Sequence, residues 1–307
     1  MSLIIGVKAD NMAVAEAFST LEFWQPEYRS LFAPGCVLEF PVAPPGWLQK
    51  LRPGEDVTHF DWLCRTVKNW KWKNVAVYAT NFPDKFWIMR DGEGDVFWAG
   101  KEGRYDGRFV TRLTIESGKI TYIKDYFDSI AAYKAAGIEL PLFKYDAPDP
   151  MSMPIRDLVP DVTGDPEALA AQTKATLSKF VSVDFWEGEI NANDIVHELP
   201  FTPVNMPKRY NAREYDALND WIGRNCLEWE TYPGSILYET HVPGVYFIES
   251  GGVGYMSWTG VEGVYQQREL SFLRIENGYA KEFHEYFNPL NKFNSINTPI
   301  PTFPYLY

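Results

Sequence analysis

The sequence predicts an α+β protein in which one domain occurs twice in tandem. The segment KDYFDSIAAYKAAGIELP at residues 124–141 reappears as HEYFNPLNKFNSINTPIP at residues 284–301. WAGKEGRYDGR (98–108) and WTGVEGVYQQR (258–268) are separated by the same 160 residues, since 258 − 98 equals 284 − 124. In each copy, helical patterns come first and closely spaced strand patterns follow, which favours helices packed on a curved antiparallel sheet.

Each copy has the length of an independent domain rather than of a solenoid repeat. We expect domain 1 at residues 1–146, a proline-rich linker at 147–164 and domain 2 at 165–307. The closely spaced prolines make the linker stiff and extended. A linker of this length allows domain 2 to dock on domain 1, which predicts an internal pseudo-dimer with a two-fold axis.

Domain 1 is expected to open with two helices separated by a short strand. Asp10 or Asn11 can cap a helix over residues 13–24, and a strand at residues 36–42 ends at prolines. The second helix is indicated by an apolar stripe at steps of three and four, made of Val57, Phe60, Cys64 and Val67.

The second half of domain 1 is predicted to be a meander of strands whose concave side offers room for a pocket. The turn signals are DGEG (91–94), AGKEG (99–103) and SGK (117–119). The strands are expected at residues 74–80, 85–91, 95–100, 108–117 and 119–127.

Domain 2 is expected to repeat this order with one local change. Asp165 precedes Pro166, which is the order typical of a helix start. The offset between the copies changes from 159 to 160 between Trp229 and Tyr238, so one residue has been gained there. Its first helix, first strand and second helix are placed at residues 167–180, 194–201 and 213–227.

The amino-acid composition of the chain restricts the kinds of molecule that it is expected to bind. The net charge of −12 argues against nucleic acid and anionic membranes. Aromatic residues make up 16% of the chain, which fits either large cores or an aromatic-lined pocket. Cys36, Cys64 and Cys226 are scattered, without metal-ligand spacing, and predict free thiols in a reducing compartment. No signal-peptide pattern or membrane-spanning run is found, so a cytoplasmic location is expected.

Several segments resemble the phenazine-biosynthesis A/B family, a SnoaL-like branch of the nuclear transport factor 2-like superfamily. They are FPVAPPG, NWKWKNVAVYAT, PDKFWIMRDGEGDVFWAGKEGRYDGRF, ESGKI and KDYFDSIAAYKAAGIELP, followed more loosely by VPGVYFIESGGVG, VEGVYQQREL and ENGYAKEFHEYFNP. The resemblance covers nearly the whole chain in two copies. It implies two cone-shaped barrels, each a curved sheet wrapped on helices, which usually pair as homodimers.

The resemblance also implies roles for particular residues. The family's general acid/base on the last strand matches Asp125 in KDYFD and Glu285 in HEYFN. The family's pocket histidine falls on Lys73, and its counterpart in domain 2 falls on Tyr232 or Pro233. The histidine is therefore missing from both copies.

Two further family positions are repeated in both domains. The tyrosine of the E-G-x-Y segment matches Tyr105 and Tyr265. A family histidine is replaced by Arg108, and Arg268 repeats that arginine. The tyrosines serve as hydrogen-bond donors to a substrate or as core residues, and the arginines bind an anion or pair with nearby acids.

Strand alternation predicts the surroundings of the two acids. If Asp125 points into the cone, Thr121, Ile123 and Phe127 lie beside it, and Phe283 and Phe287 lie beside Glu285. An acid among apolar neighbours has a raised pKa and can both donate and accept a proton. The alternative is a carboxylate held in a structural ion pair.

The remaining candidates have a functional and a structural interpretation. Lys73 is either a base or fixed cation in the pocket, or a solvated residue at a strand end. His59 lies on the second helix, where a lone histidine is more often structural than catalytic. Trp72, Trp87 and Trp98 stack on an aromatic ligand or pack in the core.

The chain shows no glycine-rich nucleotide motif, no H-E-x-x-H or paired cysteines for metal, and no G-x-S-x-G motif. We therefore expect acid–base chemistry without a cofactor. The leading hypothesis is a cofactor-free lyase acting on a bulky aromatic molecule, with formaldehyde release from a lignin-derived diarylpropane as the specific case. Lys73 or Tyr105 would hold the phenolic oxygen while Asp125 moves a proton, which makes domain 1 the expected working site.

Two alternatives stay open. One is a phenazine-type condensing enzyme or a polyketide-type cyclase or isomerase of secondary metabolism, which would take a carboxylate-bearing substrate. The other is a small-molecule binding protein without catalysis, in which the last-strand acids are dispensable.

Overall fold

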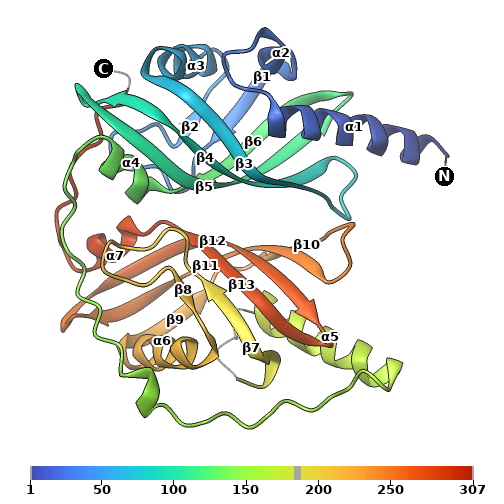
Figure 1. The fold of residues 1–307 in the computed structure, drawn as a ribbon, viewed down its shortest axis with the longest axis vertical. Coiled ribbons are helices and arrows are strands. Elements are labelled where there is room, and N and C mark those ends of the chain that lie inside the picture. The colour runs from blue at the N-terminus through green and yellow to red at the C-terminus, as the bar shows by residue number, and fades with distance from the viewer. Residues whose placement is uncertain (1, 183–187, 306–307) are drawn as a thin grey trace. The chain divides into compact units, whose positions relative to one another are not determined.

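The computed structural model describes residues 2–182 and 188–305, with side chains from residue 10 onward. The chain forms two compact units, and Figure 1 shows that each contains one curved sheet with its longer helices on one side. Unit 1 comprises Met1–Leu140 and Ile300–Tyr307, and unit 2 comprises Pro141–Pro299. The predicted tandem α+β architecture is confirmed, while the pseudo-dimer stays a prediction.

Unit 1 contains one six-stranded sheet in the order β2-β1-β6-β5-β4-β3. β1 pairs with β6 in parallel, and the other pairs are antiparallel, so the sheet is mixed rather than purely antiparallel as expected. The elements are α1 (Ser2–Thr20), α2 (Pro26–Ser30), β1 (Phe32–Glu39), β2 (Lys50–Leu51), α3 (Glu55–Thr66), β3 (Val67–Ala79), β4 (Lys85–Trp98), β5 (Lys101–Glu116), β6 (Lys119–Phe127) and α4 (Ser129–Ala135).

Unit 2 repeats this topology, with β7 parallel to β13. The counterpart of β3 is divided into two strands, at the place where the sequence predicted an additional residue. Its elements are η1 (Pro150–Ser152), α5 (Pro166–Val181), η2 (Gly188–Ile190), β7 (Asn191–Glu198), β8 (Arg209–Tyr210), α6 (Ala212–Asn225), β9 (Cys226–Thr231), β10 (Ile236–Glu239), β11 (Val245–Trp258), β12 (Val261–Glu276), β13 (Tyr279–Phe287) and α7 (Leu290–Ser295).

Helix starts follow the sequence in unit 2 but not in unit 1. Asp165 caps α5 by accepting hydrogen bonds from two backbone amides of the first turn. The two proposed caps of α1 are wrong, because this helix begins at Ser2 and includes both Asp10 and Asn11. The Asn11 side chain instead donates to the Ile115 carbonyl oxygen at 3.1 Å, which fixes the helix to β5.

The expected apolar stripe on α3 is correct in only two of its four members. Phe60 and Val67 are buried, but Val57 is 49% exposed and Cys64 is exposed, and His59 and Trp62 are buried instead. The large rings bury more apolar area than the small side chains would, so they determine which face meets the sheet.

The DGEG segment is not a turn but lies within the continuous strand β4. A Cβ atom on Gly92 would come within 2.4 Å of the Trp70 ring and 2.8 Å of the Trp72 ring. A Cβ atom on Gly252 in β11 would likewise come within 2.5 Å of the Trp229 ring. Glycine therefore lets a tryptophan lie flat against the strand on the concave side of each sheet.

The other two predicted turns are confirmed. Ala99 and Gly100 join β4 to β5, and Ser117 and Gly118 join β5 to β6. All four residues have positive φ angles, between 52° and 72°, as tight hairpin turns require.

Each unit is completed by a segment that follows the other repeat in sequence. Phe303 lies against Trp47, Trp98 and Tyr133 in unit 1, with ring centroids 5.4–5.7 Å apart. Phe143, exactly one repeat earlier at an offset of 160, lies against Phe293 and two tryptophans of unit 2. The unit boundary therefore falls after Leu140, and not at the expected residue 146.

Among the described residues no helix is long and apolar enough to cross a membrane. The three cysteines are free thiols, as expected, with Cys36 buried and Cys64 exposed.

Replacement of Gly92 by alanine is expected to destabilise unit 1 by about 1–3 kcal/mol, because the new methyl group would overlap the tryptophan rings. Gly252→Ala should have a similar effect on unit 2. Denaturant unfolding followed by tryptophan fluorescence measures both. Gly164→Ala is the control, since nothing lies within 4 Å of its added Cβ; equal stability of all three variants would contradict the prediction.

Candidate functional site

Each unit has a cavity on the concave side of its sheet, closed by its second long helix. The cavity of unit 1 has a volume of about 100 Å³, and that of unit 2 has a volume of about 300 Å³. The repeat places Trp47 and His59 in the first cavity where Met206 and Leu218 stand in the second. The Trp47 ring is larger than the Met206 side chain and fills more of the space, so the unit 2 cavity leaves more room for a ligand.

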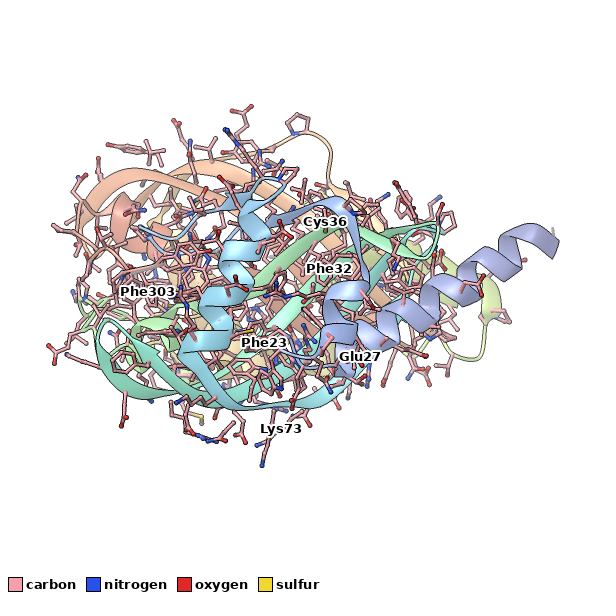
Figure 2. The ribbon with its side chains drawn as sticks, turned by 90° about the horizontal axis from the view of Figure 1, so that it is seen from above. Phe23, Glu27, Phe32, Cys36, Lys73 and Phe303 are labelled. Carbon is pink, nitrogen blue, oxygen red and sulfur yellow. The ribbon has the colours of Figure 1, made fainter. Side chains whose placement is uncertain are left out.

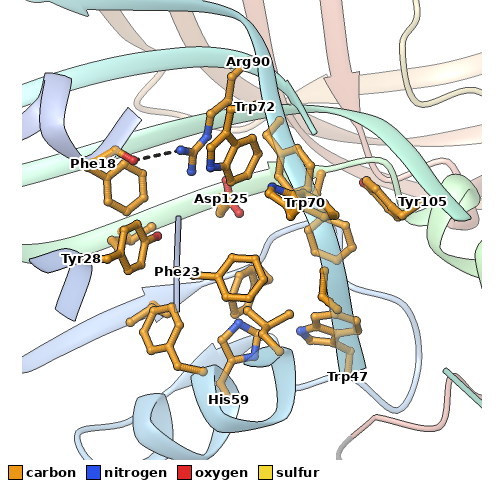
Figure 3. Close-up of a pocket in the computed structure, with 18 of the residues that line it drawn as sticks. Phe18, Phe23, Tyr28, Trp47, His59, Trp70, Trp72, Arg90, Tyr105 and Asp125 are labelled. Atoms are coloured by element: carbon orange, nitrogen blue, oxygen red, sulfur yellow. Dashed lines mark hydrogen bonds between the residues drawn. The ribbon is translucent and has the colours of Figure 1, made fainter. Parts of the chain in front are cut away.

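Asp125 lies in the wall of the unit 1 cavity, as the resemblance implied (Figure 3). Its neighbours Ile123 and Phe127 line the same cavity, which confirms the predicted alternation. The Thr111 hydroxyl donates to Asp125 Oδ1 at 2.6 Å. Burial raises the pKa of Asp125 to about 6, against the opposing effects of this hydrogen bond and of the Arg90 charge.

Arg90 provides a buried cation in this cavity that sequence reasoning missed. Its guanidinium lies 3.5 Å from the centroid of the Trp72 ring, and the two stack in Figure 3. Nη1 donates to the carbonyl oxygens of Phe18 (3.0 Å) and Ser19 (3.2 Å) near the end of α1, where the helix dipole favours a cation. The sequence signal that could have identified Arg90 is its place directly after the apolar run FWIM within a predicted strand.

Four of the proposed substrate-binding residues line the unit 1 cavity: His59, Trp72, Trp98 and Tyr105. His59 Nδ1 is 2.8 Å from the Tyr305 hydroxyl, and burial lowers the pKa of this histidine to about 3. His59 is therefore neutral at physiological pH. Their places in the cavity wall agree with the expected contact with a substrate, and they assign a catalytic role to none of the four residues.

Three candidates of domain 1 do not reach the cavity. The Lys73 side chain is 52% exposed and pairs with Glu93 at 2.7 Å, and Figure 2 shows it pointing away from the unit. Arg108 pairs with Asp91 at 3.1 Å, and Trp87 is fully buried beside Tyr126. In each case a residue an odd number of positions away along the same strand faces the cavity. Strand alternation therefore directs these three side chains to the outer face.

The unit 2 cavity holds two carboxyl groups, Glu285 from β13 and Glu269 from β12. Their side chains are mostly buried, and the Ser250 hydroxyl donates to Glu269 at 3.0 Å. Burial raises the pKa of both groups, and the charge of Glu285 raises the pKa of Glu269 further. One of the two acids therefore keeps its proton near neutral pH.

Lys292 from α7 lines the same cavity and is only 4% exposed. Five aromatic rings surround its ammonium group with centroids 4.4–5.9 Å away, and the nearest is that of Trp258. Within the described part of the chain, Lys292 has no ion pair within 4.0 Å. Burial lowers its pKa to about 8, while Glu285 and Glu269 act in the opposite direction.

His197, for which the sequence pattern indicated no role, contacts Glu285 from behind the cavity wall. Its Nε2 atom lies 2.7 Å from Glu285 Oε2. The ring is held between Phe283 and Tyr215, at 4.8 and 4.5 Å, and burial lowers its pKa to about 3. A neutral, fixed imidazole can orient the carboxyl group without adding a charge.

Tyr265 lines the unit 2 cavity as expected, and Gln267 donates a hydrogen bond of 2.6 Å to its hydroxyl. Arg268 is exposed, because it alternates with Gln267 and Glu269 on β12 and points outward. Across residues 2–182 and 188–305, no group of three His, Cys, Asp or Glu side chains converges to hold a metal ion.

The two cavities keep the same acid position but obtain their cation differently. Asp125 and Glu285 correspond at the repeat offset of 160, but Arg90 corresponds to Ser250 and Lys292 to Ala132. Glu269 corresponds to Phe109, so only unit 2 has the second acid.

The first repeat is similar to proteins of a described family. The family model described as phenazine biosynthesis protein A/B matches residues 47–149. PhzA1 of Pseudomonas aeruginosa is 30% identical over 87 residues, which are 28% of this chain and 54% of that protein. PhzA of Pseudomonas fluorescens is 31% identical over 84 residues, 27% of this chain and 52% of that protein. The chain thus spans about half the length of these relatives, and its resemblance to the phenazine biosynthesis A/B proteins is confirmed.

Solved structures give a parallel comparison. The crystal structure of a phenazine biosynthesis-related protein from Pseudomonas aeruginosa matches with 20% identity and a TM-score of 0.44, covering 50% of this chain and 98% of that one. A protein described as a SnoaL-like polyketide cyclase from Jannaschia sp. CCS1 matches with 16% identity and a TM-score of 0.34, covering 43% and 94%.

The raised pKa of Asp125 predicts a pH-dependent stability of unit 1. Because the folded state binds the proton more tightly than the unfolded state, this group reduces stability as pH rises from about 4 to about 6. Asp125→Asn should remove this part of the dependence in urea unfolding at the two pH values. The exposed Glu102→Gln is the control; a D125N curve parallel to that of the unchanged protein would contradict the prediction.

Proposed function

We propose that this protein is an acid–base enzyme whose working site is the unit 2 cavity and whose substrate is a small molecule with an aromatic part. The observation that carries the proposal is the presence of two carboxyl groups and one amine, all largely buried, in one aromatic-lined cavity of about 300 Å³. Perturbed ionisable groups that converge in a cavity of ligand size are typical of active sites.

The two carboxyl groups are suited to opposite tasks. The ionised one accepts a proton from the substrate, and the neutral one donates a proton to a leaving group. We assign the first task to Glu285, since His197 fixes its carboxyl group at 2.7 Å. Glu269, with a pKa raised by both burial and the Glu285 charge, is the proton donor.

Lys292 is assigned the role of stabilising negative charge on a substrate oxygen. A cation among aromatic rings interacts strongly with an oxygen anion, because little water is present to screen it. The rings of Trp258 and Tyr265, 4.4 and 5.3 Å from the amine, also offer faces for an aromatic substrate.

This assignment moves the working site from unit 1 to unit 2. The expectation for unit 1 depended on Lys73, which lies on the outer face of β3. Unit 1 retains Asp125 and Arg90, but its cavity is about one third as large. We infer that unit 1 is a secondary site or a structural partner.

The reaction class that we favour is elimination by a cofactor-free lyase. For a phenolic diarylpropane bound as its phenolate, Glu269 would protonate the benzylic hydroxyl, which leaves as water while an electron pair of the phenolate forms the quinone methide. Glu285 would then take the proton of the hydroxymethyl group, so that formaldehyde leaves and the electron pair restores the aromatic ring. Lys292 would hold the phenolic oxygen throughout.

The second candidate is a condensing enzyme of secondary metabolism. It is favoured by the match of residues 47–149 to the phenazine biosynthesis A/B model. In that case Lys292 would bind a substrate carboxylate, and the carboxyl pair would move protons during condensation.

Incubation with a panel of phenolic dimers, without added cofactor, should release formaldehyde. A colorimetric formaldehyde assay measures the rate, and dimers with the phenol methylated should be poor substrates because they cannot form the quinone methide. Failure of every phenolic dimer would exclude the lyase and leave the condensing enzyme.

Glu285→Gln should lower turnover by about a hundredfold or more, because an amide cannot accept the proton. Glu282→Gln is the matched control, since this neighbour pairs with Arg274 on the outer face of the same strand. Asp125→Asn, measured in parallel, tests unit 1. If D125N lost more turnover than E285Q, the assignment to unit 2 would be wrong.

A further inference from the structure

Lys292 is placed differently from a lysine that serves only as a structural cation. A structural buried cation is paired with a carboxylate or with carbonyl oxygens. In the described structure Lys292 has aromatic rings around it and no ion pair within 4.0 Å, although Glu285 and Glu269 line the same cavity. Its amine is thus available to a molecule that enters the cavity.

We infer that Lys292 is a nucleophile that captures the carbonyl carbon of an aromatic aldehyde or ketone as an imine. The inference rests on the proposed function, because it uses the same cavity and the same two acids, and it extends the substrates from those whose oxygen anion Lys292 holds to those with a carbonyl group. Lysines become nucleophilic when an apolar pocket disfavours their charged form, and burial lowers the pKa of this amine to about 8.

The groups around the amine supply the proton transfers that this reaction needs. Glu285 accepts the proton of the ammonium group, and the free amine then forms a bond to the carbonyl carbon. One proton of the attacking nitrogen moves to the carbonyl oxygen, which gives a carbinolamine. The neutral carboxyl of Glu269 then protonates this hydroxyl, which leaves as water when the carbon–nitrogen double bond forms. One amine and one carbonyl thus give one imine and one water, with no oxidant or reductant.

The cavity offers a route for a flat carbonyl compound. Asn219, Ile222 and Cys226 line it and are partly exposed, which places the opening between α6 and β9. Trp229 and Trp258 form apolar walls inside. A benzaldehyde-type molecule has the shape and polarity that such walls accept.

The corresponding position of unit 1 is Ala132, so the inferred chemistry belongs to one repeat only. Arg90, the buried cation of unit 1, cannot replace it, because a guanidinium stays protonated and is no nucleophile.

Reductive trapping on the full chain tests the inference. The protein is incubated at pH 7 with 4-hydroxybenzaldehyde and sodium cyanoborohydride, digested, and analysed by peptide mass spectrometry over time. We expect alkylation at Lys292 about tenfold faster than at Lys144, whose side chain is 66% exposed and pairs with Asp146 at 3.1 Å. Glu285→Gln should slow labelling of Lys292, and Lys292→Met should remove the fast site.

Labelling of Lys292 no faster than that of Lys144 would overturn the inference. The comparison between lysines of the unchanged protein needs no variant, so a folding defect in K292M cannot obscure it. If Lys292 is unlabelled while E285Q still abolishes turnover, the inference fails and the proposed acid–base function stands. If Lys292 is labelled but E285Q retains full turnover of every substrate, the acid–base assignment fails instead.

Discussion

The cost of placing ionisable groups in an apolar cone governs both units of this protein. Each cone closes with a strand that carries an acid among aromatic neighbours, Asp125 in one and Glu285 in the other. Water is largely excluded there, so the acid must bind its proton more tightly or have a cation nearby. Each unit has an acid with a raised pKa and a cation in the same cavity, but the residue that supplies the cation and the number of acids differ between the repeats.

The duplicated sequence has met this constraint in two ways. In unit 1, Arg90 is held by carbonyl oxygens and by the Trp72 ring, and the remaining space is filled with aromatic side chains. In unit 2, the cation comes from a helix, the second acid occupies a phenylalanine position, and smaller side chains leave room. The first arrangement resembles a stabilised core, and the second resembles a reactive centre.

The sequence predicted the architecture and the acid positions because both depend on repeated local patterns. The turns, the alternation on β6 and the cap at Asp165 are of this kind. Lys73 lies outside the cavity, although the family's pocket histidine aligns with it. Its neighbour Trp72 faces the cavity, so strand alternation turns Lys73 to the opposite face. Lys292 and His197 could not be assigned, because their roles depend on how α7 packs against β12 and how β7 pairs with β13. DGEG has the composition of a turn, but Gly92 contacts Trp70 and Trp72 on the neighbouring strand β3, and local composition does not reveal such a tertiary contact.

The place of Phe303 and Tyr305 has a consequence for how the protein is made. They cover Trp47 and Trp62 in unit 1, yet a ribosome synthesises them only after all of unit 2. Nascent unit 1 must therefore wait, with aromatic surface uncovered, until translation has passed residue 305. Unit 2 has no such delay, since Phe143 is synthesised before the residues that it covers. During biosynthesis the half of the molecule with exposed aromatic surface is therefore the one that is translated first.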